Sequence, residues 1–286
     1  VEEQGSNLLI KTDNQEKEKK IELDINGFDR TSIILALRYA YRGGYDEILL
    51  KFSNPSTIYF RTGEKVSTLD VIHEELNRMI GAEIIQEKDD SCLIKDYSRA
   101  IEADFETFYK KIFISFLESL RESIIAIDDG DLIRLRNIEQ KHDTILKYIN
   151  YCLRLTNKKF QIEEQNFVIQ SILSTIDYLI YLYKIGIIEY STYYNKKFKE
   201  DICKFLEKVY ELINIFQILV FSYTKDLLIA FAKKREEIGN TIKELSTLFP
   251  KDHLIFLVKI GQVSDYLSRI NPIRKIEKIR EDLYTT

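Results

Sequence analysis

Two carboxylates and a histidine lie together in one predicted helix. Glu139 and Asp143 are four residues apart, so both side chains lie on one face of an α-helix, and His142 directly precedes Asp143. Glu236 lies at the corresponding level of a later predicted helix. Carboxylate and imidazole groups from facing helices can hold iron or manganese in a helical bundle. Glu139, Asp143 and Glu236 are therefore candidate ligands of a divalent or ferric metal.

The same residues have an interpretation without a metal. Di-metal bundles use a Glu-x-x-His pair from each of two helices, and the predicted helices have a single such pair, Glu139 and His142. Glu139 and Asp143 then belong to a solvated, salt-bridged helix face. His142 is a half-buried residue that fixes the register of the bundle, a metal ligand, or a proton-linked switch, because a histidine titrates near pH ~6.5. The sequence alone assigns no cofactor.

Other catalytic patterns are missing from the sequence. It has no GxSxG, P-loop or GxGxxG motif, and Gly43-Gly44 lies where a helix must stop. His73 and His253 belong to no HExxH motif. We expect His73 at the surface and His253 partly exposed in the first turn of a helix. We therefore expect that the protein is not an enzyme.

The composition indicates long helices. Of the 286 residues, 10 are glycine and 3 are proline, whereas an average chain has about 12% of these two types. This scarcity argues against an all-β sandwich or barrel. Hydrophobic residues make up 45% of the chain, which is enough for a buried core and excludes global disorder.

The charge, the cysteines and the lengths of the apolar runs indicate in which compartment the protein works. The formal net charge is −4, and the chain has no strongly basic block of the kind that binds nucleic acid. Cys92, Cys152 and Cys203 are widely spaced, which predicts buried thiols in a reducing compartment. Apolar runs such as 213–221 are shorter than the ~18 residues of a transmembrane helix. We expect a cytoplasmic protein without membrane insertion.

Strand and helix signals alternate in residues 21–96. Asp29 can cap a helix that Gly43-Gly44 ends, and the pattern Ser67-Thr68-Leu69-Asp70 opens a second helix that Gly81 ends. Strands are predicted at 21–25, 47–52, 82–86 and 92–95. The order β-α-β-α-β-β predicts a small α+β domain with its helices on one side of a sheet.

The segment 1–20 precedes this domain. It contains one expected strand, Asn7 to Ile10, and a charged linker that extends to Lys20. The chain starts at Val1 and not at Met, so we expect a fragment of a longer protein.

Helical periodicity continues from Asp104 to the end of the chain. Six segments each carry one apolar stripe, and the last is expected to pass Ile270 before Pro272 kinks or ends it. They form either one long bundle or two three-helix bundles, of which we favour two, 104–195 and 196–284. The predicted fold class is mainly α with a small α+β N-terminal domain.

The two halves of the helical region resemble each other. A shift of 93 residues aligns the second and fifth helices and places His142 opposite Arg235. A shift of 75 aligns Lys184-Ile185-Gly186 with Lys259-Ile260-Gly261, and the difference between the shifts predicts a long connection at 156–164. Any two amphipathic helices align on periodicity, but the matched polar interruptions favour a duplication.

Two junctions in the α+β segment are distinctive. The sequence ALRYAYRGGYDEI at residues 36–48 and the sequence MIGAEII at residues 79–85 resemble the helix–strand junction and the glycine turn of archaeal PhoU-like phosphate-uptake regulators. Residues 1–13 resemble the final strand of the AbrB-type swapped-hairpin domain that opens such proteins. Residues 104–283 resemble the duplicated three-helix PhoU repeat.

The resemblance implies a regulator of phosphate homeostasis that acts through protein contacts. Its expected partners are a phosphate-transporter ATPase or a signalling protein, a second copy of the chain in a homodimer, and DNA through the AbrB-like part of the full-length protein; no DNA-binding residue is assigned. Asp143 and Glu236 fall where the family's acidic metal motifs lie. The family pattern Arg-Ile-Gly/Ala-Asp is matched here by Lys-Ile-Gly followed by Ile187 and Gln262, without the aspartate.

Two other functions remain open from the sequence. One is a metal-dependent enzyme that uses Glu139, Asp143 and Glu236 as ligands. The other is a sensing module in which residues 21–96 bind a small metabolite.

Overall fold

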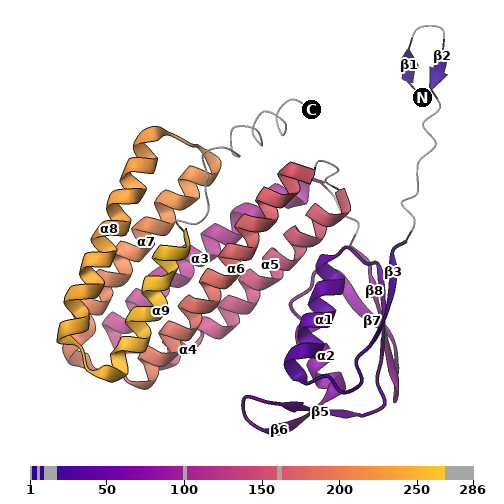
Figure 1. The fold of residues 1–286 in the computed structure, drawn as a ribbon, viewed down its shortest axis with the longest axis horizontal. Helices are drawn as coiled ribbons and strands as arrows, with labels where there is room; N and C mark the ends of the chain where they lie inside the picture. The colour runs from indigo at the N-terminus through magenta and orange to yellow at the C-terminus, as the bar shows by residue number, and fades with distance from the viewer. Residues whose placement is uncertain (1, 5–6, 10–17, 99–101, 160–162, 268–286) are drawn as a thin grey trace. The chain divides into compact units, whose positions relative to one another are not determined.

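The structure, a computed structural model, describes residues 2–4, 7–9, 18–98, 102–159 and 163–267. It divides into two compact units, Val1–Arg99 and Ala100–Thr286. The described strands all belong to the first unit, and the second unit is helical (Figure 1). The predicted fold class, mainly α with a small α+β N-terminal part, is therefore confirmed at this level.

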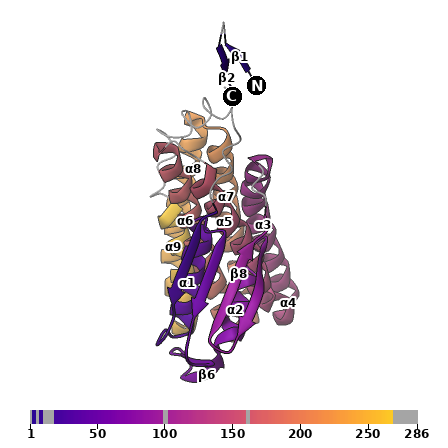
Figure 2. The same ribbon diagram turned by 90° about the vertical axis from the view of Figure 1, so that its right-hand side faces the viewer.

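The first unit contains a four-stranded sheet with the order β3-β4-β8-β7. Its strands are β3 (Lys20–Asp24), β4 (Glu47–Lys51), β7 (Ala82–Lys88) and β8 (Ser91–Asp96). The β3–β4 pair is parallel because a helix crosses between these strands, and the other two pairs are antiparallel. Figure 2 shows these strands side by side.

Two helices, α1 (Arg30–Arg42) and α2 (Thr68–Leu76), pack on one face of this sheet (Figure 1). The predicted caps are present, since the Asp29 side chain accepts from two amides of α1 and the Ser67 hydroxyl accepts from the Asp70 amide. Alternate residues of the strands, such as Ile48 and Leu50, enter the core against the helices. Residues between them on the opposite face are polar or half-buried, as expected for a sheet covered on one side.

A second hairpin was not predicted. Strands β5 (Ser56–Tyr59) and β6 (Glu64–Ser67) pair with each other as a separate two-stranded sheet. Their turn contains Gly63, whose φ of 74° is readily adopted only by glycine. The α2 helix also ends at Leu76, before the predicted stop at Gly81.

The N-terminal segment forms a short hairpin where one strand was predicted. Strand β1 (Glu2–Gln4) pairs antiparallel with β2 (Asn7–Leu9). The predicted strand corresponds to β2, although its last residue, Ile10, and most of the predicted linker lie outside the described residues.

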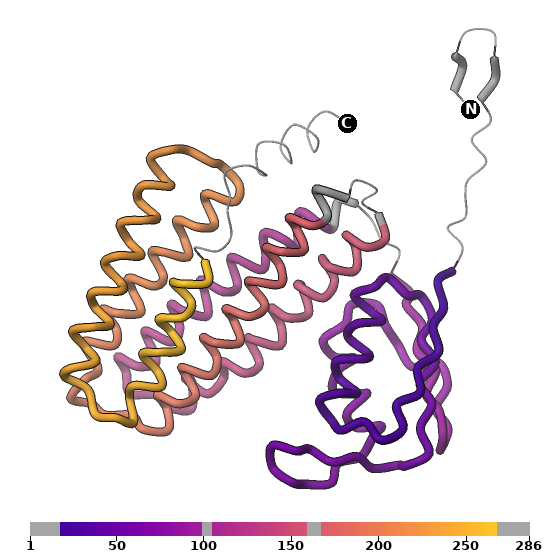
Figure 3. Tube along the Cα trace, viewed as in Figure 1, coloured from indigo at the N-terminus to yellow at the C-terminus, as the bar shows by residue number. Residues whose placement is uncertain are grey.

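The second unit consists of long helices that run side by side (Figure 3). Each of the six longest contacts the next in the order α3-α5-α6-α9-α8-α7, and α7 contacts α3, which closes a ring. The helices of this unit are α3 (Glu102–Asp129), α4 (Leu132–Arg136), α5 (Ile138–Lys159), α6 (Glu163–Thr192), α7 (Lys199–Phe221), α8 (Lys225–Leu248) and α9 (Lys251–Leu267), with the 3-10 helix η1 (Lys196–Phe198) before α7. The helices α3, α5 and α6 are consecutive around this ring, and so are α9, α8 and α7.

Two details of the helical prediction are wrong. Leu135 and Ile138 were expected in one helix, but Asn137 separates α4 from α5, with Asp131 capping α4. The long connection at 156–164 is also absent, because α5 continues to Lys159 and α6 begins at Glu163. The predicted continuation of the last helix past Ile270 lies outside the described residues.

One stretch of α6 has the length and composition of a membrane-spanning helix. It covers Phe167–Thr192 and contains an 18-residue stretch of high mean hydropathy, half of which is buried inside the unit. Counting uninterrupted apolar runs missed this stretch, because Asp177, Lys184 and Glu189 interrupt it. A helix with neighbours on two sides, here α5 and α9, buries such a wide apolar surface in a bundle as well.

Candidate functional site

His142 lies inside the helical unit, on the face of α5 that its neighbours cover. It is 7% exposed, and its Nδ1 lies 3.2 Å from Oδ1 of Asp143. Burial lowers the pKa of His142, and the adjacent Asp143 carboxylate opposes this shift. Charged groups of α6 also act on it, with Lys184 lowering its pKa and Asp177 raising it. The imidazole is therefore neutral at pH 7 and is one member of a polar cluster between α5 and α6.

The predicted metal ligands are not brought together. Glu139 and Asp143 lie on α5, which packs between α3 and α6, whereas Glu236 lies on α8, which packs between α7 and α9. Throughout the described ranges, no group of three or more His, Cys, Asp or Glu side chains is arranged to hold a metal ion. Helical spacing placed Glu139 and Asp143 on one face, but it could not show that Glu236 belongs to a different set of neighbours.

The other two histidines differ from each other in burial. His73 is exposed, with Nε2 3.1 Å from Oε2 of Glu87, as expected. His253 was expected to be partly exposed but is only 4% exposed, because it packs against the rings of Tyr190, Phe198 and Phe249. Burial lowers its pKa. The apolar residues that surround the start of α9 bury His253. Its position in the first turn of a helix did not predict this burial.

The three cysteines are free thiols. Cys92 and Cys152 are fully buried, and Cys203 is partly exposed. Burial raises the pKa of the Cys92 thiol to about 12 and that of the Cys203 thiol to about 11. At neutral pH these groups are protonated and poorly nucleophilic.

A hollow of about 180 Å³ opens in the first unit, where the parallel strands β3 and β4 end and α1 begins. The carboxyl ends of parallel strands are the usual place for ligands in sheets of this kind. Gly27, with a φ of 74°, turns the chain sharply between β3 and α1. Strand β5 and the first residue of α2, Thr68, form the opposite wall.

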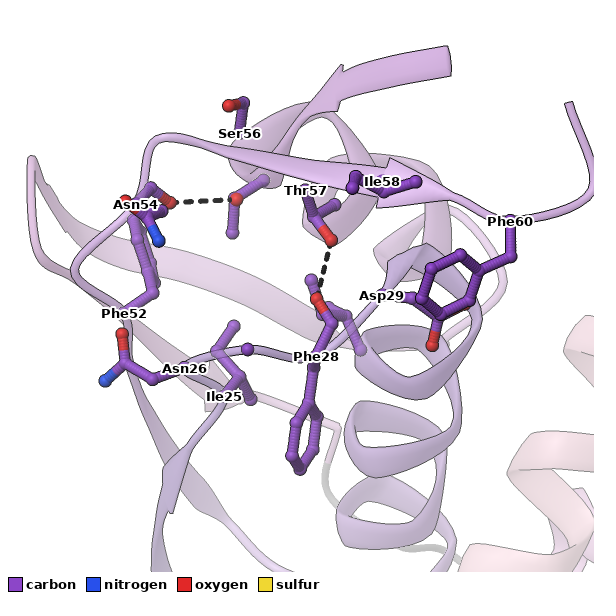
Figure 4. A pocket seen from close by; sticks show the side chains of 13 residues that line it. Ile25, Asn26, Phe28, Asp29, Phe52, Asn54, Ser56, Thr57, Ile58 and Phe60 are labelled. Carbon is purple, nitrogen blue, oxygen red and sulfur yellow. Dashed lines mark hydrogen bonds between the residues drawn. The ribbon is translucent and has the colours of Figure 1, made fainter. Parts of the chain in front are cut away.

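Figure 4 shows how the walls of the hollow are held together. The Thr57 hydroxyl of β5 donates to the carbonyl oxygen of Phe28 at 2.6 Å, and the Thr68 hydroxyl of α2 donates to the carbonyl oxygen of Asn54 at 3.1 Å. Both bonds join the hairpin region to neighbouring segments. The hollow is therefore built into the fold of the first unit.

Deeper in the first unit, ion pairs tie α1 to α2. Arg38 and Arg78 both contact the carboxylate of Glu75, which is fully buried, at 2.7 and 3.0 Å. A buried carboxylate is tolerated only when it is paired in this way. These contacts fix the positions of the two helices whose first residues line the hollow.

The residues that line this hollow were not predicted from the sequence. Asp29 was predicted as a cap and residues 21–96 as a possible metabolite site, whereas no strand or helix was predicted at 53–66. The sequence Thr62-Gly63, with β-branched residues on both sides, could have predicted the β5–β6 hairpin.

Comparison with known proteins adds no relative: no family model, no curated protein and no solved structure matches this chain.

Proposed function

We propose that this protein is a non-enzymatic regulator of phosphate uptake that acts through contacts made by two related three-helix bundles, as PhoU-like proteins do. In this proposal α3, α5 and α6 form the first bundle, and α7, α8 and α9 form the second. The single observation that carries the proposal is a pair of equivalent ion pairs, one in each set of three helices.

The first two helices of each set correspond in sequence and in contacts. Phe116-Leu117-Glu118 in α3 matches Phe205-Leu206-Glu207 in α7 at a shift of 89 residues. The same shift relates Glu122 to Glu211, and the shift of 93 relates Lys141 to Lys234. Lys141 pairs with Glu122 at 2.5 Å, and Lys234 pairs with Glu211 at 2.7 Å. A duplication accounts for both pairs at once.

The third helices support the duplication in a register different from the predicted one. A shift of 88 matches Asp177-Tyr178-Leu179 in α6 with Asp265-Tyr266-Leu267 in α9, and it aligns the first residues of the two helices. Six buried positions then coincide, whereas Val263 is buried and its match, Thr175, is only half-buried. The coinciding residues of α6 are Val168, Ile169, Ile172, Leu173, Ile176 and Leu179, and those of α9 are Phe256, Leu257, Ile260, Gly261, Ser264 and Leu267.

The Lys-Ile-Gly alignment does not give equivalent packing. A Cβ on Gly186 would meet Ile260 of α9, whereas a Cβ on Gly261 would meet Ile242 of α8. With the shift of 88, each third helix carries an aspartate, Asp177 or Asp265. This corresponds better to the PhoU-like pattern than the register that lacked both.

The exposed side of α6 and α9 supports a role in protein contacts. Tyr178 and Tyr181 of α6 and Ile255 and Val258 of α9 are 37–54% exposed, and we call them the α6/α9 face. Tyr178 and Tyr266 are in ring contact between the two helices, with centroids 4.8 Å apart. Tyrosine is enriched at protein interfaces, and exposed apolar groups favour association. In the proposal this face receives the phosphate-transporter ATPase or a signalling protein.

Co-purification tests the proposal. The full-length protein, tagged, should retain the phosphate-transporter ATPase of the same genome, and the double variant Ile255→Glu/Val258→Glu should lose at least about tenfold in affinity, because buried charge replaces apolar contact. Leu248→Glu is the matched control, since Leu248 is 63% exposed on α8. Absence of any phosphate-system partner, and of DNA binding by the full-length protein through its AbrB-like part, would refute the proposed function.

A second candidate function is a small-molecule sensing module in the first unit, which the hollow between β3, β4 and β5 favours. The metal-dependent enzyme has less support, because its three ligands belong to different helix neighbourhoods. Homodimer formation and a cytoplasmic location remain parts of the main proposal.

A further inference from the structure

The hollow of the first unit has an apolar floor and an apolar rim. Ile25, Ile33 and Phe52 form the floor and are 2–4% exposed, whereas Ile58 and Phe60 on the β5 side are 43% and 76% exposed. Covering such a rim removes apolar surface from water, which is favourable by about 25 cal/mol per Å². A ligand with an apolar body therefore matches the walls.

Three polar side chains of the hollow already donate hydrogen bonds within the protein. The hydroxyls of Thr57 and Thr68 donate to backbone carbonyls, which leaves only their lone pairs for a ligand. Asn26, also in the wall, is engaged on both sides: its Oδ1 accepts from Ser53, and its Nδ2 donates to Asp24. These three residues offer acceptors to a ligand that brings hydrogen-bond donors, and Asn54 and Ser56 of the wall carry donor groups as well.

The charge of the hollow is negative. Hydrogen bonds from Ser32 hold the pKa of Asp29 below its usual value, so this carboxylate in the wall is ionised at pH 7. Thr31 and Ser32 donate their amides to Asp29, so the N-terminus of α1 already has its anion. No Lys or Arg lines the hollow, and Arg30 next to it is bound to Glu74 at 2.6 Å. An inorganic phosphate would meet like charge here.

We propose that this hollow binds a small organic amine, with the apolar body against Ile33 and Phe52 and the ammonium group beside Asp29. Figure 4 shows Phe60 on the same side of the hollow as Asp29, where an aromatic ring can also attract a cation. This site is independent of the proposed regulator role, which rests on the helical unit.

A titration with matched probes tests the amine site. 2-Phenylethylamine, 2-phenylethanol and phenylacetate share one ring and differ in the charge of the head group, and inorganic phosphate serves as the fourth probe. Binding to the isotope-labelled full chain is followed by amide chemical shifts. The amine should shift residues of the hollow and bind at least about tenfold more tightly than phenylacetate.

Two variants separate charge from shape. Asp29→Asn keeps the helix cap, because Asn caps as well as Asp, and it should bring the amine and the alcohol to within about twofold of each other. Phe60→Ala, at an exposed position, should weaken amine binding several-fold. Leu35→Ala is the control, since Leu35 is 56% exposed on α1 outside the hollow.

Four results would overturn the amine site. They are no shifts with the amine at about 10 mM, equal affinity for phenylacetate, an unchanged preference in Asp29→Asn, and phosphate shifting the same residues. None of them bears on the pull-down that tests the regulator proposal.

Discussion

The helices α5 and α8, which the proposed duplication makes equivalent, are buried to very different extents. In α8 the buried residues are Phe231, Ile238 and Leu245, one every seven positions. In α5 a much wider face is buried, and it includes polar side chains. The buried polar residues of α5 are His142, Asn150, Arg154 and Thr156.

This difference shows that two helices with a similar apolar spacing can bury very different shares of their surface. A single stripe with a period of seven is enough to pack α8 against its neighbours, as in a coiled coil, and it leaves most of the helix facing solvent. In α5 the buried polar groups need hydrogen-bond partners, so they specify its position more strictly. The ring therefore holds α8 less tightly than α5, and variants at equivalent positions can measure this difference.

The largest effects are expected from Ile145→Ala in α5 and Ile238→Ala in α8. These two residues, which the proposed duplication makes equivalent, are 1% and 0% exposed. Each variant leaves a cavity, and the cost falls where the surroundings can collapse. We expect Ile145→Ala to lower the free energy of unfolding by about 3–5 kcal/mol and Ile238→Ala by about 2 kcal/mol. Urea unfolding followed by circular dichroism measures both, and equal costs would remove the proposed difference between α5 and α8.

Local sequence signals predicted much of what these helices and the first unit contain. Asp29 and Ser67 cap helices as predicted, because a cap depends only on a few neighbouring residues. The apolar stripe of the fifth predicted helix, α8, was also predicted from spacing, and Phe231, Ile238 and Leu245 are its buried residues. The break at Asn137 was not, because the apolar period continues across it and the tertiary contacts decide where the helix divides.

The features that the sequence did not predict depend on contacts between residues that are far apart in the chain. The register of 88 that we propose for the third helices depends on burial and on the short connections, whereas the two glycines of the Lys-Ile-Gly alignment have different neighbours. The hollow was missed because its wall comes from the unpredicted β5–β6 hairpin. Glu236 was grouped with Asp143 because periodicity gives a residue's level on a helix but not the neighbours that surround that helix.

Glycine substitutions sharpen the comparison at smaller amplitude. A Cβ on Gly239 of α8 would meet no atom within 4 Å, so Gly239→Ala should stabilise the protein by about 0.5–1 kcal/mol through helix propensity. A Cβ on Gly186 of α6 would lie 2.9 Å from Cδ1 of Ile260, so Gly186→Ala should destabilise by about 1–2 kcal/mol. Thermal unfolding checks both signs. A destabilising Gly239→Ala would show that α8 is packed more closely than proposed.

Acidification tests the neutral histidines of the helical unit. Burial lowers the folded-state pKa of His142 and of His253 below about 6.5, the unfolded value. The unfolded chain therefore takes up protons first, so this contribution to stability is present above pH ~6.5 and is lost as the pH falls. Denaturant midpoints measured from pH 7 to about pH 5 should fall less steeply in His142→Gln than in the parent, while His73→Gln, at an exposed site, leaves the slope unchanged. A slope unaffected by His142→Gln would remove its proposed proton linkage.

The smallest expected effect concerns the two equivalent ion pairs. Lys234 contacts both Glu211 and Glu237 at 2.7 Å and its side chain is 20% exposed, whereas Lys141 contacts Glu122 and is 31% exposed. Partly exposed pairs contribute about 0.2–1 kcal/mol, so Lys141→Met should cost a few tenths and Lys234→Met close to about 1 kcal/mol. Both costs should shrink in high salt, because these pairs are open to screening. If removing either lysine leaves stability unchanged at low salt, packing alone holds α5 and α8 in place.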